Sequence, residues 1–134
     1  MIKPKGLLLT VAAGAIASGA FAQDLPPLTG KDVKVRIDSP ANVQFYPRKA
    51  RQAGVEGKAT TLCTVAKNGR LSECTVIDET PAGCAFADAA LKLNRYMVIA
   101  PLAKDGTSTV GRAFKFELTL KLPDGELPRA NSCD

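Results

Sequence analysis

A strict alternation of apolar and polar residues marks the stretch from residue 114 to residue 122. The two alternating sets are Phe114, Phe116, Leu118, Leu120 and Leu122 on one side, and Lys115, Glu117, Thr119 and Lys121 on the other. A period of two residues predicts a β-strand that buries one face and leaves the other in water. The sequence Pro123-Asp124-Gly125 breaks the pattern and ends this strand.

Two further runs, residues 58–66 and 70–78, predict strands on either side of Asn68-Gly69. Asn-Gly is a strong hairpin signal because both turn positions favour a positive φ. Two forms of the turn fit the sequence: a two-residue Asn68-Gly69 turn, or a three-residue turn from Lys67 to Gly69 followed by a bulge near Ser72 and Glu73. We favour the second form, which places these side chains on one face: Val65, Leu71, Val76, Cys63 and Cys74.

Two helices are predicted around these strands. Residues 47–52 form a short helix that begins with Pro47 and ends before Gly54. Residues 84–94 form a longer helix. Its apolar stripe follows helical spacing and consists of Phe86, Ala89, Ala90, Leu93 and Met97.

The fold class that follows is α+β, with a three-stranded antiparallel sheet packed against two helices. The helices must cover the apolar face of the sheet, because no other element can bury it. Residues 33–37 alternate well enough for a short edge strand, and residues 96–101 are expected to be extended. The last long strand is the best candidate for an open edge, which a protein must cover, charge or use.

The first 22 residues are typical of a secretory signal peptide. Lys3 and Lys5 precede an uncharged stretch from Gly6 to Gly19, and Ala20-Phe21-Ala22 is a cleavage signal. The alternative is an uncleaved membrane anchor, for which this stretch is short and poor in leucine. We expect four parts: a signal peptide (1–22), a lead-in segment (23–42), a domain (43–122) and a polar tail (123–134) in which only Cys133 is fixed.

The net charge does not indicate a polyanionic partner. It is +5 for the whole chain and falls to +3 when Lys3 and Lys5 leave with the signal peptide. The remaining basic cluster, Arg48, Lys49 and Arg51, has no interleaved aromatic residues for stacking on nucleic acid. We therefore expect a solvated helix face and no nucleic-acid partner.

The four cysteines, Cys63, Cys74, Cys84 and Cys133, all follow the expected cleavage site. An even number of cysteines in a small exported domain favours disulfides. Cross-strand geometry favours Cys63–Cys74, which leaves Cys84–Cys133 to pin the tail to the start of the longer helix. A zinc site competes poorly, since the chain has no histidine and no Cys-x-x-Cys pair, so we predict no metal and no cofactor.

No residue set predicts catalysis. The chain has no histidine, and its cysteines are expected to be paired. Asp78 and Glu79 are neighbours at a strand end, so they are expected to point in different directions rather than form an acid–base pair. We therefore predict that the protein is not an enzyme.

An ordered set of residues resembles the C-terminal domain of TonB and its relatives. The set covers about Val43 to Leu122, and its order makes it fairly specific although each piece is short. It consists of Tyr46-Pro47, Ala50, Gly54-Val55-Glu56-Gly57, Val65, Gly69-Arg70-Leu71, Val76, Pro81, Phe86, Ala89-Ala90-Leu91, Pro101 and Gly106. The resemblance implies the same sheet and two helices, and the Cys63–Cys74 pair looks like that of short exported relatives.

The resemblance implies a periplasmic protein that binds a peptide segment of an outer-membrane transporter. In the family, this peptide adds a strand beside the last strand of the sheet, and main-chain hydrogen bonds supply the affinity. The partner-binding residues implied here are the outward side chains of that strand and the stretch that flanks it: Lys115, Glu117, Thr119, Lys121, Gln44 and Tyr46.

Two departures from the energy transducers of the family define the alternatives. Transducers carry a histidine in an uncleaved N-terminal helix and a long Pro-rich spacer, whereas this chain has no histidine and only the lead-in segment before Val43. We therefore expect a soluble periplasmic binding module without motor coupling. The alternatives are an energy transducer anchored in the inner membrane and facing the periplasm, and a structural domain that self-associates through its open edge.

Overall fold

A three-stranded antiparallel sheet in the order β3-β2-β5 forms the centre of the molecule. Its strands are β2 (Gly57–Val65), β3 (Leu71–Thr80) and β5 (Ala113–Leu120). The computed structural model describes residues 25–134, so the expected signal peptide and its cleavage site lie outside the described residues. Because β2 is central, both β3 and β5 are edge strands, as the sequence predicts for β5.

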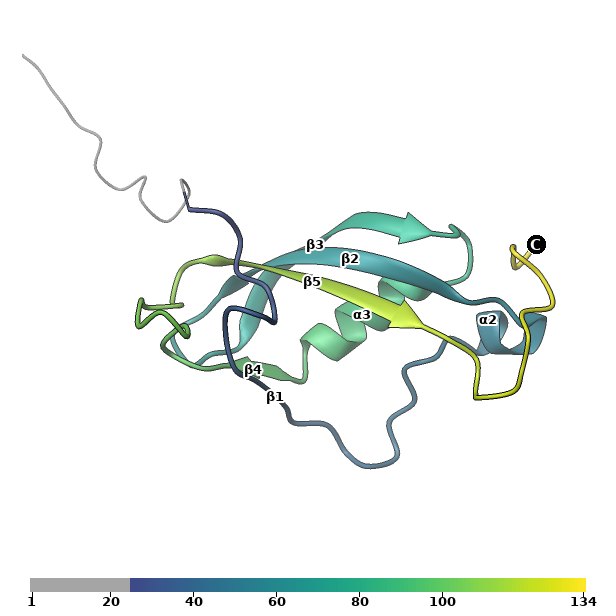
Figure 1. Cartoon of the computed structure of the whole chain (residues 1–134), viewed down its shortest axis with the longest axis horizontal. Coiled ribbons are helices and arrows are strands. Elements are labelled where there is room, and N and C mark those ends of the chain that lie inside the picture. The colour runs from purple at the N-terminus through teal and green to yellow at the C-terminus, as the bar shows by residue number, and fades with distance from the viewer. Residues whose placement is uncertain (1–24) are drawn as a thin grey trace, which may run out of the picture.

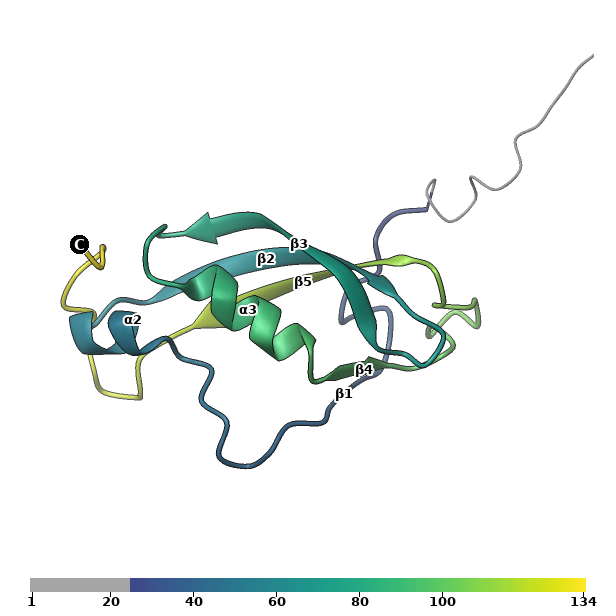
Figure 2. The same cartoon turned by 180° about the vertical axis from the view of Figure 1, so that it is seen from behind.

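The two helices lie where the apolar face of the sheet needs them. The longer helix, α3 (Phe86–Asn94), runs behind the sheet in Figure 1 and in front of it in Figure 2, while the short α2 (Arg48–Ala53) lies at one end. The predicted α+β fold, a three-stranded antiparallel sheet packed against two helices, is therefore confirmed. Within residues 25–134, no helix has both the length and the apolar character needed to cross a bilayer.

A second, two-stranded sheet lies at the end opposite α2 (Figure 1). It joins β1 (Val35–Ile37) to β4 (Met97–Ile99) in antiparallel register, with Arg36 opposite Val98. The sequence predicts a short strand near residues 33–37 and extended chain at residues 96–101. It does not predict that these two segments pair with each other, apart from the main sheet.

The hairpin between β2 and β3 has the three-residue turn that we favoured. Ala66 donates to the carbonyl oxygen of Arg70 across the turn, at 2.8 Å, and Gly69 has a φ of 84°. The expected bulge is present as well, because the register shifts between Leu62 and Thr64 and Glu73 takes a positive φ of 52°. A second shift, between Thr60 and Thr61, was not predicted.

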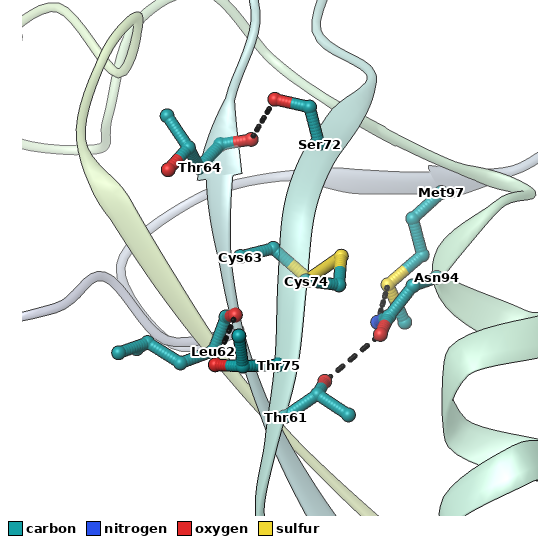
Figure 3. Close-up of a disulfide and its surroundings, with 9 residues drawn as sticks. All are labelled: Thr61, Leu62, Cys63, Thr64, Ser72, Cys74, Thr75, Asn94 and Met97. Atoms are coloured by element: carbon teal, nitrogen blue, oxygen red, sulfur yellow. Dashed lines mark hydrogen bonds between the residues drawn. A yellow bond between two sulfur atoms is a disulfide. The ribbon is translucent and has the colours of Figure 1, made fainter.

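Both disulfides have the expected pairings. Cys63 and Cys74 join β2 to β3 (Figure 3), and Cys84 joins Cys133. The Cα atoms of Cys63 and Cys74 are 4.0 Å apart. The tail is fixed at more than Cys133, which corrects the sequence-based expectation. The Arg129 N–H donates to the carbonyl oxygen of Gly54 at 2.9 Å, and Arg51 pairs with Glu126 at 3.0 Å.

The lead-in segment contributes to the core. The side chains of Leu28 and Val33 are 3% and 2% exposed and pack with Ile99 and Phe114 near the two-stranded sheet. A second core cluster lies between the sheet and the helices and includes Ala50, Val55, Ala59, Cys84, Phe86, Ala89, Ala90 and Leu118. Residues 28–35 of the lead-in segment therefore contribute side chains to the core.

One buried polar contact joins the sheet to α3. The Thr61 hydroxyl donates to the side-chain oxygen of Asn94 at 2.9 Å, and both residues are almost fully buried (Figure 3). The Asn94 amide nitrogen in turn lies 3.8 Å from the sulfur of Met97. Because an unpaired buried amide is costly, this contact fixes how α3 lies across β2.

Candidate functional site

The outer edge of β5 is the candidate site. Along this strand, backbone N–H and C=O groups point alternately toward β2 and away from it, and those that point away are available to a partner. Lys115 donates its N–H to the carbonyl oxygen of Leu28 at 2.7 Å, and Leu28 donates to Ala113 at 2.8 Å. These bonds show that Ala113 and Lys115 direct their backbone groups away from β2. In an antiparallel ladder every second residue does the same, so the backbone groups of Glu117 and Thr119 also point outward.

Leu28 therefore shortens the open edge. It forms a parallel bridge with Phe114, so the lead-in covers the first half of β5 like a very short extra strand. The main sheet has no strand beyond β5 among residues 25–134, which leaves the second half, from Glu117 onward, without a partner. Figure 1 shows this arrangement, with the dark lead-in crossing β5 near its start.

The outward side chains of β5 have the predicted orientation. Lys115, Glu117 and Thr119 are exposed. Leu118 is buried in the cluster that contains α3, and Phe114 is buried in the cluster near the two-stranded sheet. The outward residues therefore stand on the face of the sheet that carries no helix in Figures 1 and 2. An added strand at this edge would present its own side chains beside them.

A groove of about 860 Å³ lies between helix α3 on one side and the segment that precedes α2 on the other. It brings together three of the predicted site residues, Gln44, Tyr46 and Lys121, although Lys121 is far from the other two in sequence. Lys121 follows directly after β5, so the groove opens beside the end of the free edge. Its remaining lining includes Phe45, Pro47, Arg48, Lys49, Arg51, Gln52, Ala85, Asp88, Ala89, Lys92 and Pro123.

Phe45 and Lys92 hold the wall of this groove in place. The ammonium group of Lys92 donates to the carbonyl oxygen of Gln44 at 2.7 Å and lies 5.7 Å from the centre of the Phe45 ring. The Phe45 ring also meets Tyr96 edge-on, with 6.0 Å between ring centres. Gln44 is thereby fixed through its backbone, while its side chain remains exposed.

Tyr46 has a structural role alongside its place in the groove. Its hydroxyl donates to the carbonyl oxygen of Val55 at 2.5 Å, and its ring packs edge-on against Phe86. Burial raises the pKa of the Tyr46 phenol, and the nearby carboxylate of Glu56 raises this pKa further. Part of the Tyr46 side chain is therefore committed to the core rather than free for a partner.

A second hollow, of about 460 Å³, lies at the other side of the strand end. Thr119 and Lys121 line it together with Pro81 and with Pro128 of the tail. Lys121 thus lies at both hollows. The end of the free edge is consequently the one place where the predicted residues of β5 and of the Gln44–Tyr46 stretch meet.

The groove beside α2 is strongly basic. Five cationic side chains line it, against the single carboxylate of Asp88: Arg48, Lys49, Arg51, Lys92 and Lys121. Arg51 is partly neutralised, since it pairs with Glu126 of the tail. Across residues 25–134, no three cysteine or acidic side chains gather as metal ligands would.

Sequence reasoning located the strand but missed what surrounds it. The Lys115 N–H is already bonded to Leu28, so Lys115 is not part of the open half of the edge. The sequence does not predict this contact, because Leu28 is an isolated apolar residue without a periodic pattern around it. Phe45 and Lys92 were also missed as parts of the groove. The adjacent aromatic residues Phe45 and Tyr46 were the available signal.

Comparisons with known proteins agree with this geometry. The sequence model of the family described as Gram-negative bacterial TonB protein C-terminal matches residues 42–118. The chain is also similar to the solution NMR structure of the Pseudomonas aeruginosa TonB CTD, with 25% sequence identity and a TM-score of 0.53. That match covers 71% of this chain and 91% of the other. No curated protein matches the chain.

Proposed function

This chain belongs to the family of Gram-negative bacterial TonB protein C-terminal domains, and from this premise we propose that it is a periplasmic protein-binding module. It recognises a peptide segment of its partner by adding that segment as a strand to the free half of the β5 edge. The partner is a segment of an outer-membrane transporter that faces the periplasm. The role is one of binding, without catalysis.

The observation that carries this proposal is the unpaired backbone of Glu117 and Thr119. Main-chain groups on an open edge give a partner strand its affinity without requiring a particular sequence. The groove that contains Gln44, Tyr46 and Lys121 begins where this edge ends. Side chains of the partner that pass the end of β5 would enter it, and this gives the site a means of selecting its partner.

The surroundings of the edge support a short added strand. Leu28 already bonds the Ala113 carbonyl oxygen and the Lys115 N–H, so an incoming segment pairs from Glu117 toward the end of β5. The basic lining of the groove favours a segment with acidic residues beyond the paired part. We also propose that the exported chain is cleaved after Ala22, and an intact mass that retains residues 1–22 would contradict this.

A titration with synthetic peptides tests the binding proposal. The peptides copy periplasm-facing segments of outer-membrane transporters from the same bacterium, and fluorescence anisotropy reports their binding. The informative variant is Thr119→Pro. The N–H that it removes points outward, so the ladder to β2 keeps its bonds while an added strand loses one of its own.

Val76→Pro is the matched control on the opposite edge. Val76 lies opposite Thr61 of β2, and odd-numbered residues of β2 bond to β5, so the Val76 N–H also points outward. We expect a peptide that binds the wild type and Val76→Pro alike and binds Thr119→Pro at least about tenfold more weakly. If no peptide binds, or if Thr119→Pro binds as well as the control, the proposal is wrong.

A second candidate function, self-association through the same edge, is favoured by the charge pattern of β5. The order of charged and neutral side chains along its open half allows one chain to pair with another copy of itself. Sedimentation of the protein alone at several concentrations distinguishes the two candidates, because self-association raises the mass without any peptide.

A further inference from the structure

The positive charge of the chain is gathered at one end of the molecule, opposite α2. Three segments form this basic end: residues 25–38, the hairpin turn at residues 66–70, and residues 96–112 (Figures 1 and 2). They carry seven lysine and arginine side chains against three aspartates. The other described segments, residues 39–65, 71–95 and 113–134, carry nine cationic and nine acidic side chains. The small net charge therefore conceals a very uneven distribution.

Main-chain hydrogen bonds hold the three segments of the basic end together. Strand β1 of the first segment pairs with β4 of the third. The Ile99 N–H donates to the carbonyl oxygen of Gly69 in the hairpin turn at 2.8 Å, and the Lys104 N–H donates to that of Asp32 at 2.8 Å. The basic end is therefore one fixed surface rather than three independent loops.

Most of the cationic charge at the basic end is free. Arg36 and Arg70 share Asp38, at 2.9 Å and 3.4 Å, while the carboxylates of Asp32 and Asp105 accept hydrogen bonds from threonines of their own turns. Within residues 25–134, four exposed lysines of this end form no salt bridge: Lys31, Lys34, Lys67 and Lys104. Their charges are available to an anionic surface.

Apolar side chains are exposed among these lysines. Leu102 is 58% exposed and Val110 is 38% exposed. Leu102 bridges to Ser108, so the chain is extended there, and the next residue, Ala103, is buried in the core. Because side chains alternate along extended chain, Leu102 points outward beside Lys104. An exposed leucine among free lysines is typical of proteins that lie on a membrane surface.

A groove of about 430 Å³ joins the charged and apolar parts of this end. Lys34, Arg36 and Lys67 line it together with Val110, and no acidic side chain of the described residues does. A phosphate group in this groove would meet cations from two of the three segments. Its acyl side would meet the apolar wall.

We propose that the basic end docks on the surface of a bilayer that contains anionic phospholipids. The free lysines attract the lipid phosphates, the groove takes a headgroup between Lys34 and Lys67, and Leu102 enters the layer between headgroups and acyl chains. The cations come from three segments across a broad end, with an apolar side chain exposed between them. A wide anionic surface matches this pattern better than a narrow acidic segment of a protein.

Docking in this way leaves the open half of β5 accessible. Strand β5 begins at the basic end and runs away from it (Figure 1), so Glu117 lies about 13 Å along the strand from Ala113. The protein can therefore lie on a bilayer and present its free edge at the same time. Docking itself requires nothing of the proposed function.

Co-sedimentation of the purified exported protein with lipid vesicles tests the docking. One preparation mixes phosphatidylethanolamine with anionic phosphatidylglycerol, and the other consists of neutral phosphatidylcholine. We expect binding to the first preparation alone, and we expect this binding to weaken at least about tenfold from low to physiological salt, because salt screens exposed charges.

Matched variants separate the basic end from net charge. Lys34→Glu with Lys67→Glu should weaken vesicle binding at least about tenfold. Arg48→Glu with Lys49→Glu changes the net charge equally at the opposite end and should alter binding by less than about twofold.

A second pair of variants tests the apolar contact. Leu102→Asp should weaken vesicle binding at least about threefold more than Leu127→Asp, which alters an 81% exposed leucine of the tail. All of the substituted side chains in both tests are exposed, and urea denaturation checks that each variant keeps its fold.

Four results would overturn the proposal. They are no binding to the anionic vesicles at low salt, equal binding to both preparations, equal weakening by the two charge variants, and Leu102→Asp binding as well as Leu127→Asp. Binding of soluble polyglutamate through Lys34 and Lys67 without vesicle binding would instead assign this end to an acidic protein. None of these outcomes bears on peptide binding, which the titration with Thr119→Pro tests separately.

Discussion

The main-chain N–H of Leu28 donates a 2.8 Å hydrogen bond to the carbonyl oxygen of Ala113. Leu28 lies outside residues 42–118, the part of the chain that matches the family, whereas Ala113 lies inside it. A segment of this chain outside the family match thus occupies part of the edge at which a partner is proposed to bind. The length of the open edge is set by this contact.

Amide hydrogen exchange should reveal the boundary that Leu28 creates. In dilute protein, the amide of Lys115 should exchange slowly because it donates to Leu28, whereas the amides of Glu117 and Thr119 should exchange quickly. The amides of Phe116 and Leu118 point toward β2 and serve as slow controls. Residue-resolved NMR measures all of these rates, and equal protection at Lys115 and Thr119 would show that the edge is not divided in this way.

Gly57→Ala should destabilise the fold by about 1–3 kcal/mol, the range for overpacking a filled core. A Cβ atom at this position would collide with the ring of Phe86 and lie 2.5 Å from the carbonyl oxygen of Thr80. Gly30→Ala is the control, since nothing lies within 4 Å of the atom that it adds. Urea denaturation compares the two variants, and equal unfolding free energies would contradict the close packing of α3 on β2.

The two disulfides should stabilise the fold unequally. The sequence separation is 11 for Cys63–Cys74 and 49 for Cys84–Cys133. The chain-entropy model gives about 3 kcal/mol for the shorter loop and about 4 kcal/mol for the longer one. Replacing each pair by alanines should therefore lower the free energy of unfolding more for Cys84 and Cys133. The reverse order would show that local packing outweighs loop closure.

Stability should fall at alkaline pH through Tyr46. Burial raises the pKa of this phenol above its usual value of 10.0, so the folded state favours the neutral form. The resulting stability is complete below the ordinary tyrosine pKa and is lost as the pH rises through the folded-state pKa. Tyr46→Phe should remove this alkaline loss, and at neutral pH it should cost about 1 kcal/mol for the lost bond to Val55.

The control for this prediction is Tyr96→Phe, which should keep the alkaline loss. Chemical denaturation at a series of pH values from neutral upward measures both variants. If Tyr46→Phe shows the same alkaline loss as the wild type, ionisation of Tyr46 is not its cause.

The main sheet could be predicted from the sequence because its signals are local. The alternation along residues 114–122 and the Asn68-Gly69 turn each specify their own geometry. The bulge near Glu73 was favoured because it places Val65, Leu71 and Val76 on the same face as the two cysteines of the hairpin. These elements need no information about distant parts of the chain.

The surroundings of the candidate site could not be predicted, because they depend on contacts between distant segments. Leu28 is a single leucine after two prolines, and nothing in its neighbourhood shows that it will pair with β5. Arg129 anchors a tail whose composition looks unstructured. The groove likewise joins Gln44 to Lys121, and only the folded chain brings these residues together.

The central claim, that a partner strand adds to the free half of β5, is tested most directly by photocrosslinking in the native envelope. A photoreactive amino acid replaces Thr119, and in a matched strain it replaces Thr75, which is also exposed but lies on β3. We predict that Thr119 crosslinks to the periplasm-facing segment of an outer-membrane transporter, identified by mass, and that Thr75 does not. Absence of any transporter segment at Thr119, or its equal capture at both positions, would contradict the claim.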